Sequence, residues 1–331
     1  MRYIASAFDK VWHIGLLHKM LKLKFPSYII FWLFEFLKDR KFRVKCEDYI
    51  SDLFDITAGV PQGAVLSPIL FSIYINDNPL WNKKNRDYGL LFADDLISLN
   101  IFKKFGNIEK HVNKYLRKLE GWLKKWRLMM APSKCNYLVF SKKSESEAAK
   151  LNLKLFNENV CVSESPTFLG IRFDRHLTFK NQINYLQDTC INRLNFLKII
   201  SKRSFGLKTE TLNYVYISII RSVLEYSSLI SCNLAKSNLK KILTIQSKAI
   251  KIINHKPIYA SLREIETDII SLEDRFEQLN KKYIINAILN GNELITTLWN
   301  EYLEYKTNHP LFNDTILCNF KDEITNITIN N

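Results

Sequence analysis

The sequence contains few residues that break or crosslink a fold. Its 331 residues include nine glycines, eight prolines and six cysteines. The cysteines are scattered, without a Cys-x-x-Cys pair or a cluster with histidine, so neither a zinc site nor a disulfide framework is indicated. We therefore expect a reduced, intracellular protein, although no signal distinguishes the nucleus from the cytoplasm.

A long apolar run is also missing. The best candidate, residues 28–37, is shorter than the roughly 18 residues that a membrane span requires, and it contains Glu35. The N-terminal residues meet a charge too early for the apolar region of a secretory signal. We therefore interpret the two glycosylation sequons, at Asn313 and Asn326, as chance matches.

Acidic residues are outnumbered by basic ones. The chain has 33 Asp and Glu against 48 Lys and Arg, a net charge of +15, which favours a polyanionic partner such as nucleic acid. A membrane surface or plain solubility explains the same excess, so charge alone does not decide. With 47% hydrophobic residues, the chain can bury a sizeable core and form two closely packed domains.

The apolar pattern of the first half predicts helices and strands in alternation. Three segments place apolar residues at helical intervals: 13–24, 26–38 and 66–76. The last of these is apolar nearly all round, so we expect it to be buried. β-prone residues predict a hairpin at 41–57 and two short strands within 88–99. This order indicates the α+β fold class.

The second half is predominantly helical in pattern. A polar loop at 141–150 and a hairpin at 168–173 precede it. The expected helices are 181–200, 209–227 and 236–253. We place a boundary near residue 175, which gives a first domain of 1–175, a second of 176–305, and a tail of 306–331 that carries no clear pattern and is expected to be loosely packed.

One predicted helix, within residues 103–127, is strongly basic. It holds nine Lys or Arg, and its acidic residues are Glu109 and Glu120. Apolar residues such as Val112 and Leu119 supply the opposite face. A solvated helix face and a contact with nucleic acid explain this pattern equally well.

The first candidate for chemistry is Phe92-Ala93-Asp94-Asp95, where two carboxylates follow an apolar strand. Phosphoryl transfer needs acidic side chains that hold metal ions roughly 3.5 to 4 Å apart. Neighbouring residues of a strand face opposite sides, so both carboxylates can share a site only at a turn. An Asp-Asp pair by itself is more often an exposed turn or a helix cap, so its context has to decide.

The context is a loop, residues 59–68, that enters the apolar helix about thirty residues earlier. Glycines at 59 and 63 allow a backbone to approach a ligand closely, and Gln62 offers both a donor and an acceptor. A purely structural turn is the plain alternative. Ten such residues in this order are nevertheless difficult to attribute to chance.

With further blocks included, the chain resembles the reverse transcriptases of non-LTR retrotransposons, most similarly those of Jockey-like elements. The blocks that carry the resemblance are 7–13 with 15–17, then 59–68 with 70–71 and 74–77, then 92–95, 126–128, 132–134 and 168–171. Their order and spacing agree with the family. The resemblance continues more loosely through 221–226 to 272–275.

The resemblance implies a fold and a reaction. The fold is a reverse-transcriptase palm, a mostly antiparallel sheet backed by helices, followed by a helical thumb and connection region. The reaction is RNA-templated DNA synthesis, in which a primer 3′-hydroxyl attacks the α-phosphate of a deoxynucleotide and pyrophosphate leaves. The implied partners are an RNA template, a DNA primer and deoxynucleotides, and the implied ion is Mg²⁺, because oxygen ligands suit it. No membrane partner is expected, and the oligomeric state stays open.

The resemblance also assigns roles near the acidic pair. Asp94 and Asp95 would be metal ligands, Asp94 the more important, with Phe92 at the aromatic position of the motif. Phe8 resembles the bulky residue that excludes a ribose 2′-hydroxyl, and its alternative is a residue of the core. Gln62 and Gly63 would lie against the incoming nucleotide and the template.

Two further roles follow from the same resemblance. Lys134 matches a lysine near the phosphates of the nucleotide, a general acid for the leaving pyrophosphate, and its alternative is a solvated lysine. The hairpin that grips the primer end corresponds to Phe168, Leu169, Gly170 and Ile171. Ordinary strand packing is the alternative for Phe168.

Position 3 departs from the family pattern. The family supplies a third carboxylate as an Asp five residues before the Phe of the Ala-Phe-Asp block, and counting back from Phe8 gives Tyr3. A phenol is neutral at physiological pH, with a pKa of about 10, and it is bulkier than a carboxylate. Asp9 could substitute only with a local shift of the backbone. We therefore expect weak or absent metal binding and an inactive enzyme.

The start of the chain points the same way. Met1 lies just before position 3, so we expect the fingers and the upstream endonuclease to be missing, as in a decayed element or a truncated gene prediction. Two alternatives stay open. One is a non-catalytic nucleic-acid-binding relic that uses the basic 103–127 face and the thumb helices, and the other is a translated product without a stable fold.

Overall fold

The structure is a computed structural model, and it describes residues 2–3, 7–79, 87–102, 105–140, 151–232, 234–305, 320 and 324. The chain divides into two compact units, Met1–Gly170 and Ile171–Asn331. The division lies between residues 170 and 171, whereas the sequence placed a boundary near residue 175. The predicted loop at 141–150 lies outside the described residues.

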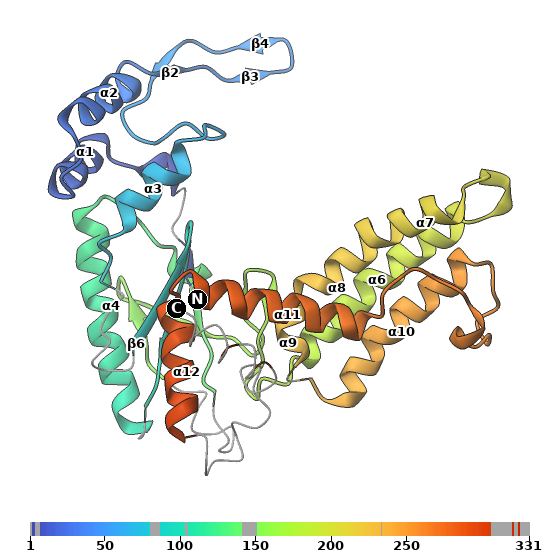
Figure 1. Cartoon of the computed structure of the whole chain (residues 1–331). Coiled ribbons are helices and arrows are strands. Elements are labelled where there is room, and N and C mark those ends of the chain that lie inside the picture. The colour runs from blue at the N-terminus through green and yellow to red at the C-terminus, as the bar shows by residue number, and fades with distance from the viewer. Residues whose placement is uncertain are drawn as a thin grey trace. The chain divides into compact units, whose positions relative to one another are not determined.

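The first unit contains an antiparallel three-stranded sheet of order β1-β7-β6. The strands are β1 (Arg2–Tyr3), β6 (Asp87–Phe92) and β7 (Asp95–Asn100). β6 and β7 form the hairpin that the sequence predicted within 88–99. Figure 1 shows the longest helix of this unit, α4 (Ile108–Lys125), running beside this sheet.

Three more helices precede the sheet hairpin, at the predicted places: α1 (His13–Lys22), α2 (Ser27–Leu37) and α3 (Ser67–Ile75). The unit has one core, to which all four helices contribute, including Leu16, Leu33, Phe71, Tyr74 and Leu119. The prediction that the apolar helix at 66–76 is buried all round is wrong at Ile69, whose side chain is 55% exposed. A single helix packed on one side leaves its far side to solvent.

Short strands complete the first unit. They pair as β2 (Lys41–Phe42) with β5 (Phe54–Asp55), β3 (Lys45–Cys46) with β4 (Tyr49–Ile50), β8 (Asn136–Tyr137) with β11 (Cys161–Val162), and β9 (Lys154–Leu155) with β10 (Glu158–Asn159). The first two pairs form the hairpin predicted at 41–57, and residues 41–50 are all exposed. The mixture of helices and mainly antiparallel strands confirms the α+β class.

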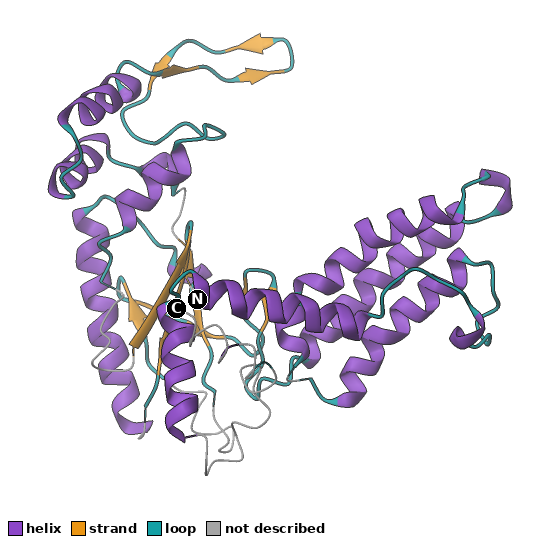
Figure 2. Ribbon diagram, viewed as in Figure 1, coloured by secondary structure: helices purple, strands orange, loops and turns teal. Residues whose placement is uncertain are grey.

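The second unit is nearly all helix (Figure 2). Its helices are α6 (Lys180–Ile200), α7 (Thr209–Tyr216), α8 (Ser222–Tyr226), α9 (Ser228–Ser231), α10 (Lys236–Ile253), α11 (Leu272–Leu289) and α12 (Glu293–Tyr305). The predicted helix at 209–227 is not uniform, because a π-helical turn at Ile217–Arg221 joins α7 to α8. Leucine and isoleucine side chains of α6, α7, α8 and α10 form its main core.

A smaller core closes the far end of α11. Ile284 and Trp299 pack with Phe320 and Ile324, the two described residues of the range 306–331. Both side chains are buried against apolar residues of α11 and α12. No helix in the described part of the chain is long and apolar enough to cross a membrane.

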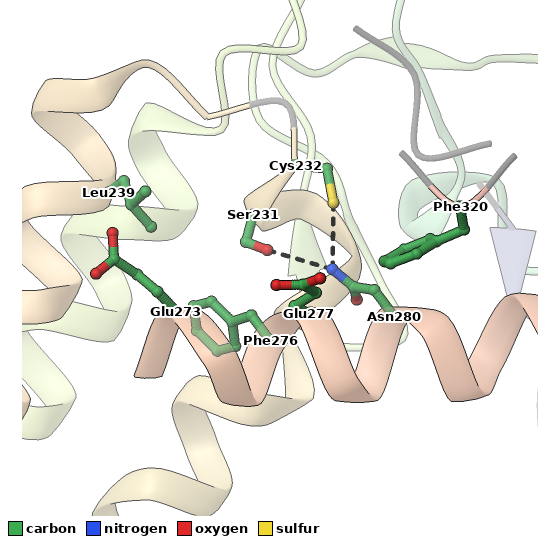
Figure 3. A pocket seen from close by; sticks show the side chains of 8 residues that line it. All are labelled: Ser231, Cys232, Leu239, Glu273, Phe276, Glu277, Asn280 and Phe320. Carbon is green, nitrogen blue, oxygen red and sulfur yellow. Dashed lines mark hydrogen bonds between the residues drawn. The ribbon is translucent and has the colours of Figure 1, made fainter. Parts of the chain in front are cut away.

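A pocket of about 390 Å³ lies between α9 and α11 (Figure 3). Asn280 is one of the residues that line it, and its Nδ2 donates hydrogen bonds to the Ser228 carbonyl oxygen (3.2 Å) and to the Cys232 sulfur (3.2 Å). These bonds tie the short helix α9 to α11. The sequence contained no pattern that indicated this pocket.

Candidate functional site

Asp94 and Asp95 lie at the tip of the β6–β7 hairpin. Phe92 pairs with Asp95 across the two strands, so the connecting loop consists of Ala93 and Asp94. Ala93 has a φ of 49°, in the left-handed region where a non-glycine residue costs about 1 to 3 kcal/mol. The turn that the sequence required at this pair is confirmed, and it is a strained one.

The negative charge of Asp94 disfavours a charge on Asp95. Both side chains are half-buried. Partial burial, and secondly the negative charge of Asp94, raise the pKa of Asp95. Two like charges held side by side are relieved by a proton or by a cation. The turn therefore has the electrostatic character of a cation-binding position.

The backbone brings position 3 to the same place. Tyr3 is the direct partner of Asp95 in the antiparallel β1–β7 pair. The 3-10 helix η4 (Pro132–Lys134) contacts β1, so the exposed Lys134 comes from a segment beside that strand. Residues that lie far apart in the sequence thus converge on the acidic turn.

The glycine-flanked loop packs on the segment that carries Phe8 and Asp9. The Val60 N–H donates to the Phe8 carbonyl oxygen (2.9 Å), and the Gly59 N–H donates to that of Val11 (2.8 Å). Gly59 has a φ of 94°, and a Cβ there would lie 3.0 Å from the Asp9 Cα. Only glycine fits this close approach, as expected from the sequence.

Gln62 and Asp9 are hydrogen-bonded to each other. The Gln62 Nε2 donates to Asp9 Oδ1 over 2.9 Å, and both side chains are exposed. Gly63 has a φ of 82° and open space around it. The sequence analysis expected Asp9 to replace the carboxylate missing at position 3 only if the backbone shifted. In this structure the Asp9 side chain is hydrogen-bonded to the loop instead.

Phe8 is partly buried and packs against α3. Its ring centroid lies 5.0 Å from that of Phe71, with the planes tilted by 31°. Phe71 itself is fully buried. The contact holds one side of the Phe8 ring in the core, in line with the alternative interpretation, and the partial exposure leaves ring surface available to a ligand.

The hairpin predicted at 168–173 is present. β12 (Thr167–Phe168) and β13 (Ile171–Arg172) form a two-stranded sheet. Its two-residue turn, Leu169 and Gly170, has φ values of 46° and 76°. A turn with both central residues in the left-handed region matches the twist of a tight hairpin, and leucine is an unfavourable residue there. Strain is again located at residues that the family resemblance singles out.

Comparison with known proteins shows the family. A family model described as reverse transcriptase (RNA-dependent DNA polymerase) matches residues 4–173. The chain belongs to the reverse transcriptase family.

The curated relatives that this chain matches are polymerases of mobile elements. The RNA-directed DNA polymerase from mobile element jockey of Drosophila melanogaster is 31% identical over 307 residues, which cover 89% of this chain and 32% of the relative. The jockey polymerase of Drosophila funebris is 30% identical, covering 85% and 31%. The probable polymerase from transposon BS of Drosophila melanogaster is also 30% identical, covering 83% and 31%. The predicted resemblance to Jockey-like elements is confirmed, and the chain spans less than a third of the length of these relatives.

Some of the sequence blocks shared with the family stabilise the packing of helices in the first unit and lie outside the acidic turn. The Lys19 side chain of α1 is only 4% exposed, and its Nζ lies 3.7 Å from the centroid of Trp126 and 4.9 Å from those of Tyr74 and Trp122. It donates to Asp77 Oδ1 over 2.5 Å. Burial lowers the pKa of Lys19 to about 8, against the opposing effect of Asp77. We call these five residues the lysine joint.

Sequence reasoning missed the lysine joint. Tyr74, Asp77 and Trp126 all lie in matched blocks, but Lys19 was only a polar position between apolar residues of a predicted helix. A lysine next to an apolar position of an amphipathic helix, as Lys19 is next to Met20, does not indicate by itself that the side chain is buried. The joint connects α1, α3 and α4.

Two looser blocks meet in the second unit. Glu225 forms ion pairs with Arg221, over 2.8 Å, and with Arg275, over 2.9 Å. Arg275 belongs to α11, and the other two belong to the π-helical turn and α8. The blocks at 221–226 and 272–275 are therefore parts of one structural contact.

The acidic turn supplies two neighbouring carboxylates. Reverse transcriptases use divalent metal ions, and carboxylate oxygens suit such ions. Among the described residues, however, no group of three His, Cys, Asp or Glu side chains could hold a metal ion. Asp94 and Asp95 provide two carboxylates, and the strand position opposite Asp95 carries tyrosine.

Proposed function

We propose that this chain carries the polymerase centre of an RNA-directed DNA polymerase from a non-LTR retrotransposon, and that the reaction is lost or very weak here. The ancestral reaction is RNA-templated DNA synthesis inside the cell, with an RNA template, a DNA primer and deoxynucleotides. The first unit would correspond to the palm, and the helical second unit to the thumb and connection region.

One observation carries the proposal of lost activity. The β1–β7 register sets position 3 directly opposite Asp95, and directly opposed positions are the closest pair that two strands offer. A carboxylate at position 3 would therefore complete an acidic cluster with Asp94 and Asp95. Tyrosine supplies no negative charge at neutral pH.

The remaining roles are proposed for residues around this cluster. Asp94 and Asp95 would hold Mg²⁺, which in this family stabilises the charge that develops on the transferred phosphate. Phe8 would face the sugar of the nucleotide, and the open backbone at Gly63 would lie against the nucleotide and template. Gln62 would also lie against the nucleotide and the template.

Two proposed roles lie at the edges of the cluster. Lys134 is exposed on the segment beside β1, where an ammonium group could donate a proton to the leaving pyrophosphate. Phe92 precedes the acidic turn and is 63% exposed, which suits contact with a ligand more than a role in the core. The hairpin at Phe168–Ile171 would hold the primer end.

Primer extension tests the proposal. The purified chain is assayed on an RNA template with a DNA primer, with Mg²⁺ and separately with Mn²⁺, beside the variant Asp94→Asn. We expect no extension, or a trace that disappears in Asp94→Asn. Robust extension by the unmodified chain would contradict the loss of activity. A trace that survives Asp94→Asn would contradict the assignment of the acidic turn.

A further inference from the structure

The exposed side of α4 is entirely basic. All its exposed residues are lysine or arginine apart from Gly121: Lys110, Lys114, Arg117, Lys118, Lys124 and Lys125. At 3.6 residues per turn, these positions fall within an arc of about 120°, and they extend over roughly 22 Å of helix. We call this surface the basic face of α4.

The two acidic side chains of α4, Glu109 and Glu120, form hydrogen bonds with the segment around β9. Glu109 Oε2 accepts a hydrogen bond from the Asn152 N–H (3.0 Å), and Glu120 Oε1 accepts one from the Phe156 N–H (2.7 Å). Asn113, between them, accepts from the Lys154 N–H (2.9 Å). These three side chains of α4 therefore bind the backbone of the segment that contains β9. Both carboxylates are hydrogen-bonded there, and neither forms an ion pair with a side chain of the basic face.

The central lysine and arginine side chains of this face have no partner among the residues that the structure describes. Lys110, Lys114, Arg117 and Lys118 make no ion pair and no side-chain hydrogen bond with any residue that the structure describes. Lys114 has basic residues three and four positions away, and like charges at this spacing destabilise a helix. A merely solvated face would be more stable with mixed charges. The arrangement is explained if a polyanion neutralises it.

The surroundings of the face select the kind of polyanion. An amphipathic helix binds a membrane by inserting its apolar side, but Val112, Leu116, Leu119 and Leu123 are all buried in the core. Gly121, near the centre of the face, leaves open space where a bulky backbone can approach the helix. None of the exposed side chains of this face is aromatic and able to stack on a nucleic-acid base. The face therefore suits binding to phosphate groups, without specificity for base sequence.

We propose that the basic face of α4 binds the phosphodiester backbone of a nucleic acid, as a surface additional to the acidic turn and independent of base sequence. The choice of nucleic acid rests on the proposed function, because a template or primer longer than the polymerase site supplies such a backbone. RNA and DNA share this chemistry, and so do single strands and duplexes.

Salt-dependent binding tests the proposal. The variant Lys110→Gln, Lys114→Gln, Arg117→Gln and Lys118→Gln keeps good helix formers and removes four charges. Affinity of the full chain for labelled RNA and DNA, single-stranded and duplex, is measured by fluorescence anisotropy over a range of salt. Each lost phosphate contact lowers the slope of log affinity against log salt by about 0.7 for single strands and 0.9 for duplex. We expect the slope to fall by about 3.

A matched control removes the same charge elsewhere in the unit. Lys22, Lys24, Lys38 and Lys45 are also exposed, and their replacement by Gln should change the slope by less than about 1. A second variant, Lys114→Gln with Arg117→Gln, should give about half the loss of the fourfold variant. Circular dichroism of each variant checks that the fold is retained, which is expected because the substitutions relieve repulsion.

The outcomes separate this proposal from the proposed function. Equal slopes for the fourfold variant and its control would overturn the α4 surface even if primer extension occurs. A lower slope in the fourfold variant alone would support it even if no extension is found. Failure of the unmodified chain to bind any nucleic acid at low salt, or binding only to phosphatidylserine vesicles, would also overturn it.

Discussion

The acidic turn and the lysine joint lie in the same unit and differ in how their charged side chains are compensated. At the turn, Asp94 and Asp95 are adjacent, half-buried like charges on a strained backbone. In the joint, a single buried cation is surrounded by three rings and one carboxylate. In the joint the protein itself supplies the partners of the buried charge, whereas the two adjacent carboxylates of the turn would be stabilised by a bound cation.

The difference separates two kinds of matched block. Blocks whose residues satisfy one another, such as 74–77 and 126–128, hold helices together. Blocks that keep unfavourable features, such as 92–95 and 168–171, are the ones to which we assign contacts with a ligand. A strained backbone and adjacent like charges persist in proteins mainly where function requires them. Substitutions in each region should therefore have different kinds of effect.

The largest effect is expected at the joint. Lys19→Ala should lower the free energy of unfolding by about 3 kcal/mol, because it leaves a cavity between the rings and removes the partner of Asp77. Lys19→Met is the matched variant, and it should stay within about 1 kcal/mol of the parent, since it fills the space without a charge to desolvate. Urea unfolding measures both. Equal losses in the two variants would show that the charge, not the volume, holds the joint.

The pH dependence of stability sharpens the same point. The pKa of Lys19 is lowered from 10.5 to about 8, so between these values the unfolded chain holds a proton that the folded chain has released. Stability of the parent should therefore rise with pH across this window, relative to Lys19→Met, by an amount that approaches about 3 kcal/mol. Unfolding at pH 7.5 and at pH 10 gives the difference. A parallel pH dependence in the two proteins would contradict a lowered pKa.

At the acidic turn, the expected effect is on metal affinity. Tyr3→Asp should raise the affinity for Mn²⁺ at neutral pH at least tenfold, or about 1.4 kcal/mol, by adding a carboxylate opposite Asp95. Tyr3→Asn removes the phenol without adding charge and is the control. Electron paramagnetic resonance of free Mn²⁺ measures the binding. If both variants bind alike, position 3 does not belong to the cluster.

A metal site at the turn also predicts a pH effect. Because burial and Asp94 raise the pKa of Asp95, protons compete with the ion more effectively than at an ordinary carboxylate. Mn²⁺ affinity in Tyr3→Asp should therefore rise with pH through the raised pKa of Asp95. The same titration in Tyr3→Asp with Asp95→Asn should lose this rise, and its persistence would assign the dependence to another group.

The smallest effects concern backbone strain. Ala93→Gly should raise the free energy of unfolding by up to about 1 kcal/mol, because glycine accepts a positive φ without steric cost. Gly63→Ala should lower it by about 1 kcal/mol for the opposite reason, in a position with open space where packing does not interfere. Thermal unfolding compares the two. Changes of the same sign would indicate that strain is not what distinguishes these turns.

Several features were predictable because they depend on neighbouring residues. The β6–β7 hairpin followed from apolar runs around Asp94-Asp95, and Gly59 from a loop that needs a positive φ. Helical intervals located α1, α2, α6 and α10. Ile69 was misjudged, since an apolar residue in a helix does not reveal how many sides of that helix are covered.

The sequence by itself determined the local periodicity, the turn at the acidic pair and the basic character of α4, because each arises from residues within one turn or one helix. Only the tertiary structure decided that position 3 faces Asp95, that Lys19 is enclosed by rings from α3 and α4, and that Glu109 and Glu120 bind the 152–156 backbone. These contacts join segments far apart in the chain, and their energy depends on burial that no local pattern specifies.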